Sequence, residues 1–115
     1  MHNISHRDFA CLLSILDSIK KIELYSNRFS TADDFYADTL SFDATMMNFI
    51  VIGEMVEKLN DSFVENTSKN IDWYKVKGFR NIIAHNYFGI DAEEVWQIIH
   101  NSLPKLKASI ELLIK

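Results

Sequence analysis

The three residues of greatest chemical interest in this chain lie between positions 80 and 87. They are Arg80, His85 and Tyr87, near the end of an otherwise apolar stretch. A guanidinium can bind a phosphate through two N–H donors at once, and an imidazole can move a proton near neutral pH. Cleavage of an RNA phosphodiester without a metal ion requires both abilities. This segment is therefore the first candidate for a functional site.

Helical geometry gives this segment a core side and a solvent side. With about 100° per residue and Arg80 at 0°, Asn81 and His85 fall near about 100° and 140°. The apolar residues of the segment gather instead near about 260° to 320°, and they are Val76, Phe79 and Ile83. Arg80 lies on the boundary, where its stem can cover apolar surface while its head reaches outward. We therefore expect His85 to lie at the surface and not in the core.

The spacing of Arg80 and His85 indicates a dimer. The two residues are five positions apart, so one helix does not aim both side chains at a single point. A second copy, related by a two-fold axis, could place two Arg/His sets around one cleft. If the helix continues as far as Tyr87, that residue returns to the side of Arg80.

Helical segments are expected before this motif. Ser5 and Asp8 resemble a capping box, and apolar residues follow at helical spacing to about residue 25. Thr31 and Asp34 could cap a short helix. A longer helix is expected from about Leu40 to Leu59, carrying the apolar stripe Met46, Phe49, Ile50, Gly53, Val56 and Leu59. Residues 61–71 are polar and are expected to form a loop.

The motif helix and a last helix complete the chain. Asp72 is a suitable N-cap for the motif helix, and Gly89 marks the next break. Asp91 and Glu94 then open a last helix, which Pro104 should kink or divide because proline lacks the amide that bonds one turn back. These elements predict an all-α fold, an up-and-down bundle of four main helices with a short extra helix. We expect one domain over residues 1–115.

Composition supports one compact helical domain. The chain has 115 residues, of which 48% are hydrophobic, with only three glycines and one proline. So few turn formers argue against a fold with many hairpins. The one cysteine, Cys11, cannot form an internal disulfide. The first residues lack the basic and apolar regions of a signal peptide, and the apolar runs are too short to span a membrane. We expect a soluble, cytoplasmic protein.

Charge narrows the class of nucleic acid that could bind. The net charge is −4, which excludes the broad basic face of a protein that coats duplexes. Basic residues do gather just before the motif, where Lys69, Lys75, Lys77 and Arg80 stand against one acid, Asp72. On charge alone, this segment is either a solvated helix face or a local contact with RNA. If the protein acts on RNA, the lack of a broad basic surface favours single strands or loops over duplexes.

The order of short motifs along the chain resembles a known family. The motifs are Ile52-Gly53-Glu54, Asp72-Trp73, Gly78-Phe79-Arg80-Asn81, His85-x-Tyr87, Gly89-x-Asp91 and Val95-Trp96. From about residue 7 to residue 113, the chain resembles the HEPN superfamily, and most closely the HepT toxins of two-gene toxin–antitoxin modules. The fold of that family is a helical bundle that dimerises.

This resemblance implies an endoribonuclease that needs no metal ion or cofactor. Arg80 and His85 would form the catalytic pair, and a ribose 2′-hydroxyl would attack the adjacent phosphorus. His85 would act as a general acid or base, and Arg80 would stabilise charge on the phosphate oxygens. Asn81 shares the face of His85 and could orient the imidazole or the phosphate.

The resemblance also implies a partner and a modification. The partner is a small nucleotidyltransferase, the antitoxin, which adds AMP groups to Tyr87 and so silences the toxin. Bulk and negative charge beside Arg80 would repel an RNA backbone. Without the resemblance, Tyr87 would be taken for a tyrosine that packs its ring and exposes its hydroxyl.

Several alternatives stay open. Glu54 either pairs with Arg80 or faces solvent. His2, His6 and His100 are scattered and have no second ligand at zinc spacing, so no metal site is expected. The alternative function is a non-catalytic HEPN subunit that docks a nucleotidyltransferase and helps present its substrate. A plain helical dimerisation protein with an accidental motif is the third hypothesis.

Overall fold

The structure is a computed structural model that describes residues 4–85 and 89–115, without the side chains of residues 82, 84 and 85. Every regular element in these ranges is helical. The elements are α1 (His6–Ser26), α2 (Ala32–Ala37), α3 (Thr39–Lys58), α4 (Asp61–Thr67), α5 (Trp73–His85), α6 (Ala92–Gln97), a π-helical turn (Ile98–Ser102) and α7 (Leu103–Leu113).

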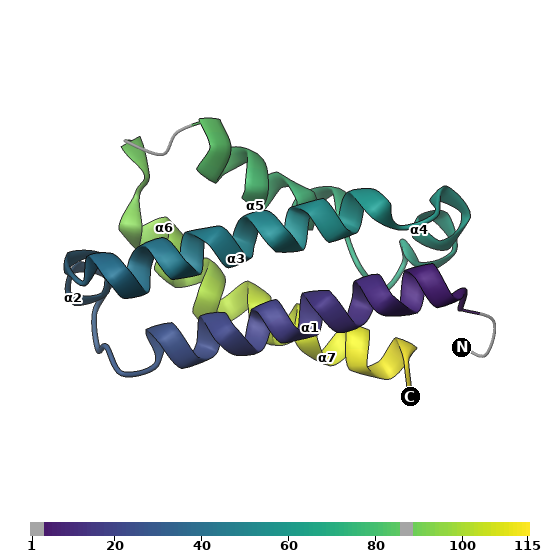
Figure 1. Ribbon diagram of the computed structural model, residues 1–115, viewed down its shortest axis with the longest axis horizontal. Coiled ribbons are helices and arrows are strands. Elements are labelled where there is room, and N and C mark those ends of the chain that lie inside the picture. Colours follow the sequence, from purple (N-terminus) through teal and green to yellow (C-terminus); the bar gives the residue numbers. More distant parts are fainter. Residues whose placement is uncertain (1–3, 86–88) are drawn as a thin grey trace.

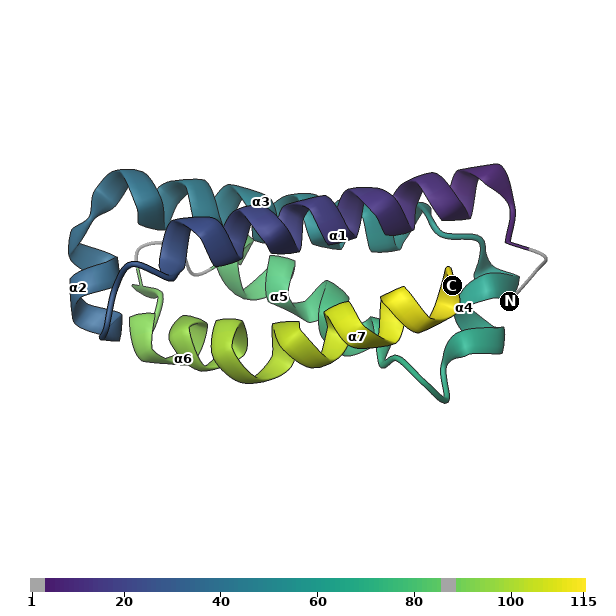
Figure 2. The same cartoon turned by 90° about the horizontal axis from the view of Figure 1, so that it is seen from below.

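Four long helical spans run up and down along one axis, and α6, the π-turn and α7 form the fourth. Figure 1 shows α1 and α3 side by side along the length of the molecule, with α2 and α4 at its two ends. Figure 2 shows α6 and α7 on the other side of the molecule, with α5 between them and α3. The extents of 44 × 26 × 21 Å give an elongated bundle. The predicted all-α bundle of four main helices is confirmed, although the described residues form two short helices beside the four long spans, α2 and α4, and not one.

The core forms where the apolar stripes of the long helices meet. The innermost side chains have essentially no exposed surface, and they are Leu12, Ile15, Ile19, Ile22, Phe35, Phe49, Ile52, Leu103 and Ile110. They come from α1, α2, α3 and α7, so burial of these stripes fixes the order of the bundle. Among the described residues, no helix is long and apolar enough to cross a membrane.

Side-chain caps begin the helices where the sequence predicts them. The Ser5 hydroxyl accepts a hydrogen bond from the Asp8 amide at 3.1 Å, and the Thr31 hydroxyl accepts one from the Asp34 amide at 3.1 Å. The Asp91 carboxylate caps α6 by accepting hydrogen bonds from the amides of Glu93 and Glu94, at 3.0 and 3.4 Å. Each cap satisfies an amide that has no partner inside its helix.

Asp8 does more than complete a cap. The residue is 3% exposed, and its carboxylate accepts hydrogen bonds from the backbone and side-chain amides of Asn60, at 2.9 and 3.0 Å. The start of α1 is therefore tied to the start of α4, a contact between residues 52 positions apart in the sequence.

The expected loop at 61–71 is wrong over its first part, because Asp61–Thr67 forms α4. This helix has little apolar periodicity of its own, and it is held by tertiary contacts. The Phe63 ring packs at 6.4 Å from the Trp73 ring, and the Trp73 indole donates a 2.8 Å hydrogen bond to the Thr67 hydroxyl. A short helix stabilised by a partner outside it leaves no amphipathic pattern to read.

A π-turn interrupts the regular α-helix directly before Pro104, where the sequence predicts a kink or a division. Pro104 lies in the first turn of α7, directly after the π-turn, where the Leu103 amide donates to the Ile98 carbonyl five residues back. A proline ring collides with the carbonyl four residues before it. The wider π-turn accommodates that ring, so the helix continues after it.

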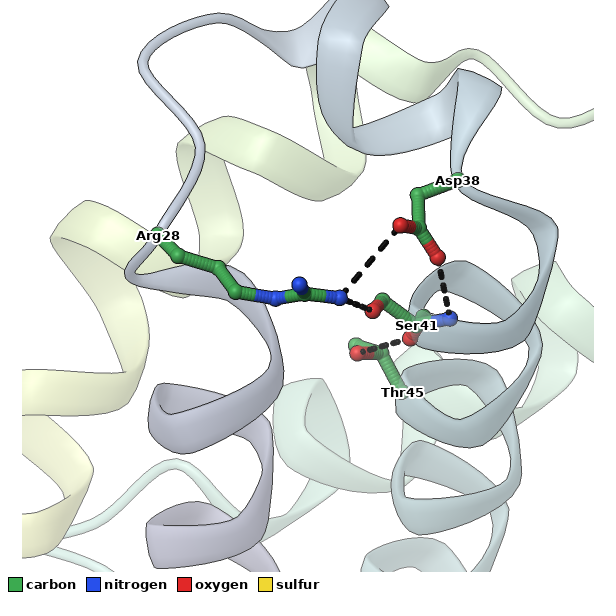
Figure 3. A network of polar contacts seen from close by, with 4 residues as sticks. All are labelled: Arg28, Asp38, Ser41 and Thr45. Atoms are coloured by element: carbon green, nitrogen blue, oxygen red, sulfur yellow. Dashed lines mark hydrogen bonds and ion pairs between the residues drawn. The ribbon is translucent and has the colours of Figure 1, made fainter.

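A polar network fixes the connection between α1 and α3. Arg28 donates to the Ser41 hydroxyl at 2.7 Å and to the Asp38 carboxylate at 3.3 Å, while the other carboxylate oxygen caps α3 by accepting from the Ser41 amide at 3.0 Å (Figure 3). The Ser41 carbonyl in turn accepts from Thr45 at 2.8 Å. The hydrogen bond from the Ser41 amide is the largest cause that keeps the pKa of Asp38 below its usual value. The Ser41 hydroxyl and the charge of Arg28 lower this pKa further.

Candidate functional site

The helix that carries the motif lies unusually close to α3 at one point. A Cβ added to Gly53 would collide with the Cβ of Arg80 and would lie 2.9 Å from its Cδ and 3.1 Å from its Cγ. Only a residue without a side chain allows the Arg80 stem to lie there. Gly53 therefore forms the surface on which Arg80 is seated.

The Arg80 side chain is held by packing and not by an acid. The residue is half-buried, as its boundary position on the helix predicts. Its Nε is fully buried and has no hydrogen-bond partner among the described residues. None of the ion pairs in that part of the chain involves Arg80. An arginine kept free of carboxylates retains its terminal N–H groups for an anionic ligand.

An ion pair one helical turn away borders this arginine. Lys77 Nζ lies 2.8 Å from Glu57 Oε1. The hydrogen bond and the positive charge of Lys77 are the main causes that lower the pKa of Glu57, and the charge of Arg80 lowers it further. Arg80 thus acts electrostatically on Glu57 without being paired to it.

The neighbours of Arg80 on the motif helix follow the predicted faces. Val76, Phe79 and Ile83 are buried, and Asn81 is exposed. His85 is the last residue of α5, and only its backbone is described. The His85 side chain and the whole of Tyr87 lie outside the described residues, so the placement of both side chains stays a prediction.

Glu54 is on the exposed side of α3 and forms no ion pair or hydrogen bond with another described side chain. The acid whose pKa the charge of Arg80 lowers is Glu57, which the sequence analysis did not single out. Glu57 stands four residues after Gly53, and Lys77 three residues before Arg80. On two antiparallel helices, these spacings bring Lys77 opposite Glu57 when Arg80 lies against Gly53. They are the signal in the sequence that could have indicated the ion pair. Among the described residues, no group of three or more histidine, cysteine, aspartate or glutamate side chains could hold a metal ion.

The fold and the surroundings of Arg80 define a class of protein: a small helical bundle in which the motif helix presents an arginine packed on a glycine of α3, with a lysine one turn away. The HepT-like ribonuclease family matches residues 15–113. The chain therefore belongs to the HepT-like ribonucleases.

Relatives that match over most of their own length agree with this family. A candidate RNase of Methanocaldococcus jannaschii (MJ0127) is 34% identical over 106 residues, which cover 92% of this chain and 86% of the relative. A candidate ribonuclease HepT of Thermococcus cleftensis is 28% identical over 111 residues, which cover 96% and 97%.

A third similar protein is longer than this chain. It is an M. jannaschii protein named for γ-glutamylcyclotransferase and RNase (MJ0434), 34% identical over 96 residues, and the match covers 84% of this chain but 42% of that relative's length. No solved structure gives a significant match.

Proposed function

We propose that this protein is the toxin of a toxin–antitoxin module, a metal-independent endoribonuclease that uses Arg80 and His85. The observation that carries the proposal is the seating of Arg80 on Gly53, with its Nε buried and no acid paired to it. An unpaired buried donor costs about 1–3 kcal/mol, so it needs an explanation, and a functional role of the residue is one. The terminal N–H groups of the same guanidinium are the ones that would bind a phosphate. Membership of the HepT-like ribonucleases supplies the reaction class.

The proposed reaction is an internal transfer at phosphorus. The ribose 2′-oxygen forms a bond to the adjacent phosphorus while the bond from phosphorus to the 5′-oxygen breaks. The products are a 2′,3′-cyclic phosphate and a 5′-hydroxyl. One imidazole accepts the 2′-hydroxyl proton or donates a proton to the 5′-oxygen. Arg80 binds the two non-bridging oxygens, on which negative charge builds up.

A dimer would complete the site. Arg80 and His85 are separated by about 140° around the helix axis, so two copies meeting along α5 would bring an arginine of one copy near a histidine of the other. Asn81, exposed beside Arg80, would orient the imidazole or the phosphate. The RNA would be single-stranded, because a chain of net charge −4 has no broad basic face for a duplex.

The proposed partner is a small nucleotidyltransferase that transfers AMP to the Tyr87 hydroxyl. In that step the tyrosine oxygen bonds to the α-phosphorus of ATP, and pyrophosphate leaves. The added phosphate would repel RNA from Arg80. Both partners would act in the cytoplasm, where RNA and ATP are found. Incubation with ATP and the partner should add mass to the peptide containing Tyr87, and Tyr87→Phe should prevent it.

The test of the catalytic pair is cleavage of a mixed RNA pool in the presence of EDTA. We expect wild type to cut, and His85→Ala and Arg80→Ala each to lose at least 100-fold, the scale of a general acid–base or charge-stabilising group. His6→Ala is the matched control, because His6 is exposed at the start of α1, outside the motif, and should cut like wild type.

Equal cutting by wild type and His85→Ala would overturn the assignment of the pair. No cutting by any unmodified, folded protein would favour the alternative, a non-catalytic subunit that docks a nucleotidyltransferase. The chain would then retain the bundle and the partner without the reaction.

A further inference from the structure

A cavity lies on a different side of the motif helix from Asn81. It has a volume of about 210 Å³ and lies between the first half of α5 and the junction of the π-turn with α7. Its walls on α5 are Lys75, Val76 and Phe79, at about 220°, 320° and 260° when Arg80 is at 0°. Asn81 falls near about 100°, so this cavity is separate from the exposed face of the motif.

The floor of the cavity is apolar and its rim is basic. Val76, Phe79 and Leu106 line it and are each no more than 7% exposed. Lys75 and Lys105 stand at the rim, both exposed. Neither lysine takes part in an ion pair among the described residues. In a chain of net charge −4, two unpaired lysines over one apolar hollow favour a ligand with a negative group and a flat apolar part.

The acid at the rim of the cavity forms no ion pair with Lys75 or Lys105 among the described residues. Asp72 lines the cavity, but its carboxylate accepts a 3.0 Å hydrogen bond from the Lys75 amide as the cap of α5. It is therefore held against the backbone at the start of the helix. The amino group of Lys75 remains free to bind an anion.

The π-turn supplies polar groups that could form hydrogen bonds with a ligand. Asn101 and Ser102 belong to it and line the cavity. The Asn101 amide nitrogen donates to Gln97 at 2.8 Å, which leaves its carbonyl oxygen as an acceptor, and the Ser102 hydroxyl can donate or accept. Single π-turns occur often at functional sites because they displace side chains from the regular helical faces.

We propose that this cavity binds one nucleotide, with the base on the apolar floor and the phosphate between Lys75 and Lys105. A cavity of about 150 Å³ is large enough to bind benzene, so this one can hold one base but not a whole nucleotide. The phosphate must then stay at the rim, where the lysines are. The nucleotide is either free or one unit of an RNA strand whose scissile bond lies at Arg80. The second case rests on the proposed function.

The experiment is a titration of ¹⁵N-labelled protein followed by NMR, with two probes. One probe is AMP, and the other is a short single-stranded RNA with 2′-O-methyl groups, which cannot be cut. We expect shifts at the amides of the cavity walls, such as Val76, Ser102 and Ser109. Shifts with both probes identify a site for a free nucleotide, and shifts with the strand alone identify a subsite for RNA.

Two charge-matched variants decide whether the lysines bind the phosphate. Lys75→Glu with Lys105→Glu should weaken binding at least 10-fold. Lys20→Glu with Lys115→Glu makes the same change of charge at exposed positions outside the cavity and should weaken binding less than 3-fold. Ser109→Phe should block the cavity without changing charge. Equal weakening by both double variants, or no shifts at the cavity walls, would overturn the proposal.

These measurements do not depend on cleavage. Wild type that cuts RNA but gives no cavity shifts would leave the ribonuclease proposal intact and remove the nucleotide site. Wild type that gives the shifts but never cuts RNA would leave the nucleotide site intact and remove the ribonuclease proposal.

Discussion

Gly53 and Arg80 pack so closely that a change at the glycine should move the arginine. Gly53→Ala would place a Cβ against the Arg80 stem, 2.9 Å from its Cδ. Overpacking of this kind costs about 1–3 kcal/mol. We expect the free energy of unfolding, measured with urea, to fall by that amount. We also expect kcat/KM on RNA to fall at least 10-fold, because the Arg80 side chain must move away from α3 and the guanidinium moves with it.

Gly78→Ala is the matched control on the motif helix itself. No atom lies within 4 Å of a Cβ added there, and alanine in a helix interior is more stable than glycine by about 0.5–1 kcal/mol. This variant should be more stable than wild type and equally active. Similar behaviour of the two variants would show that Gly53 has no special relation to Arg80.

The ion pair of Lys77 with Glu57 gives a prediction for acid pH. Its main consequence is a lowered pKa of Glu57 in the folded state. A lowered carboxyl pKa stabilises the fold above the unfolded value and loses that effect as pH falls through the folded value. The effect is therefore complete at neutral pH and is lost below about pH 4, the ordinary range of glutamate.

Lys77→Met should raise the pKa of Glu57, as measured by ¹³C NMR of its carboxyl carbon during a pH titration. It should also make the acid unfolding of the protein less steep, because fewer protons are then taken up on unfolding. Lys75→Met, on another side of the helix, should leave that carboxyl unchanged. An unchanged titration in Lys77→Met would contradict the 2.8 Å pair.

At the scale of elements, α4 is held by its contact with the start of α5. The buried Thr67 hydroxyl donates to the Phe63 carbonyl at 2.7 Å and accepts from the Trp73 indole at 2.8 Å. Thr67→Val keeps the shape but leaves the indole N–H without a partner. We expect a loss of about 1–3 kcal/mol in the free energy of unfolding.

Ser68→Ala provides the comparison for that loss. Ser68 is the exposed neighbour, and its hydroxyl bonds only within its own turn. A surface change of this kind stays within about 0.5 kcal/mol of wild type. If thermal or urea unfolding shows the same stability for both variants, the indole contact does not hold α4 in place.

The long helices were predictable from the sequence, and α4 was not. α1, α3 and α5 each combine a side-chain cap with apolar residues at helical spacing, and both signals lie within the element. α4 has only Phe63 and Val64 as large apolar residues, and its stability comes from Trp73 beyond its end. A local pattern cannot carry a contact of that kind.

In the candidate site, too, some features follow from the sequence and others do not. The boundary position of Arg80 and the exposure of Asn81 follow from the regular rotation of one helix. The seat on Gly53 and the pair of Lys77 with Glu57 depend on the register between α3 and α5, which the whole bundle sets. Glu54 and Glu57 differ by three positions in one helix, and only that register distinguishes them.

At the scale of the whole molecule, the proposed cleft needs two copies. A mixture of Arg80→Ala and His85→Ala proteins tests this, after the two are unfolded and refolded together so that subunits exchange. If one copy supplies the arginine and the other the histidine, mixed dimers have one complete set and the mixture should cut more RNA than either variant. Activity no greater than that of the separate variants would place each pair within one copy.

The most direct measurement of the proposed chemistry is the fate of one scissile bond. An RNA oligonucleotide that wild type cuts at a single position is compared, in EDTA, with the same oligonucleotide carrying 2′-deoxyribose on the 5′ side of that bond. We expect a 2′,3′-cyclic phosphate and a 5′-hydroxyl from the first and no cutting of the second, since the 2′-oxygen is the nucleophile. Cutting of the deoxy substrate at a similar rate, or a 5′-phosphate product, would contradict this mechanism.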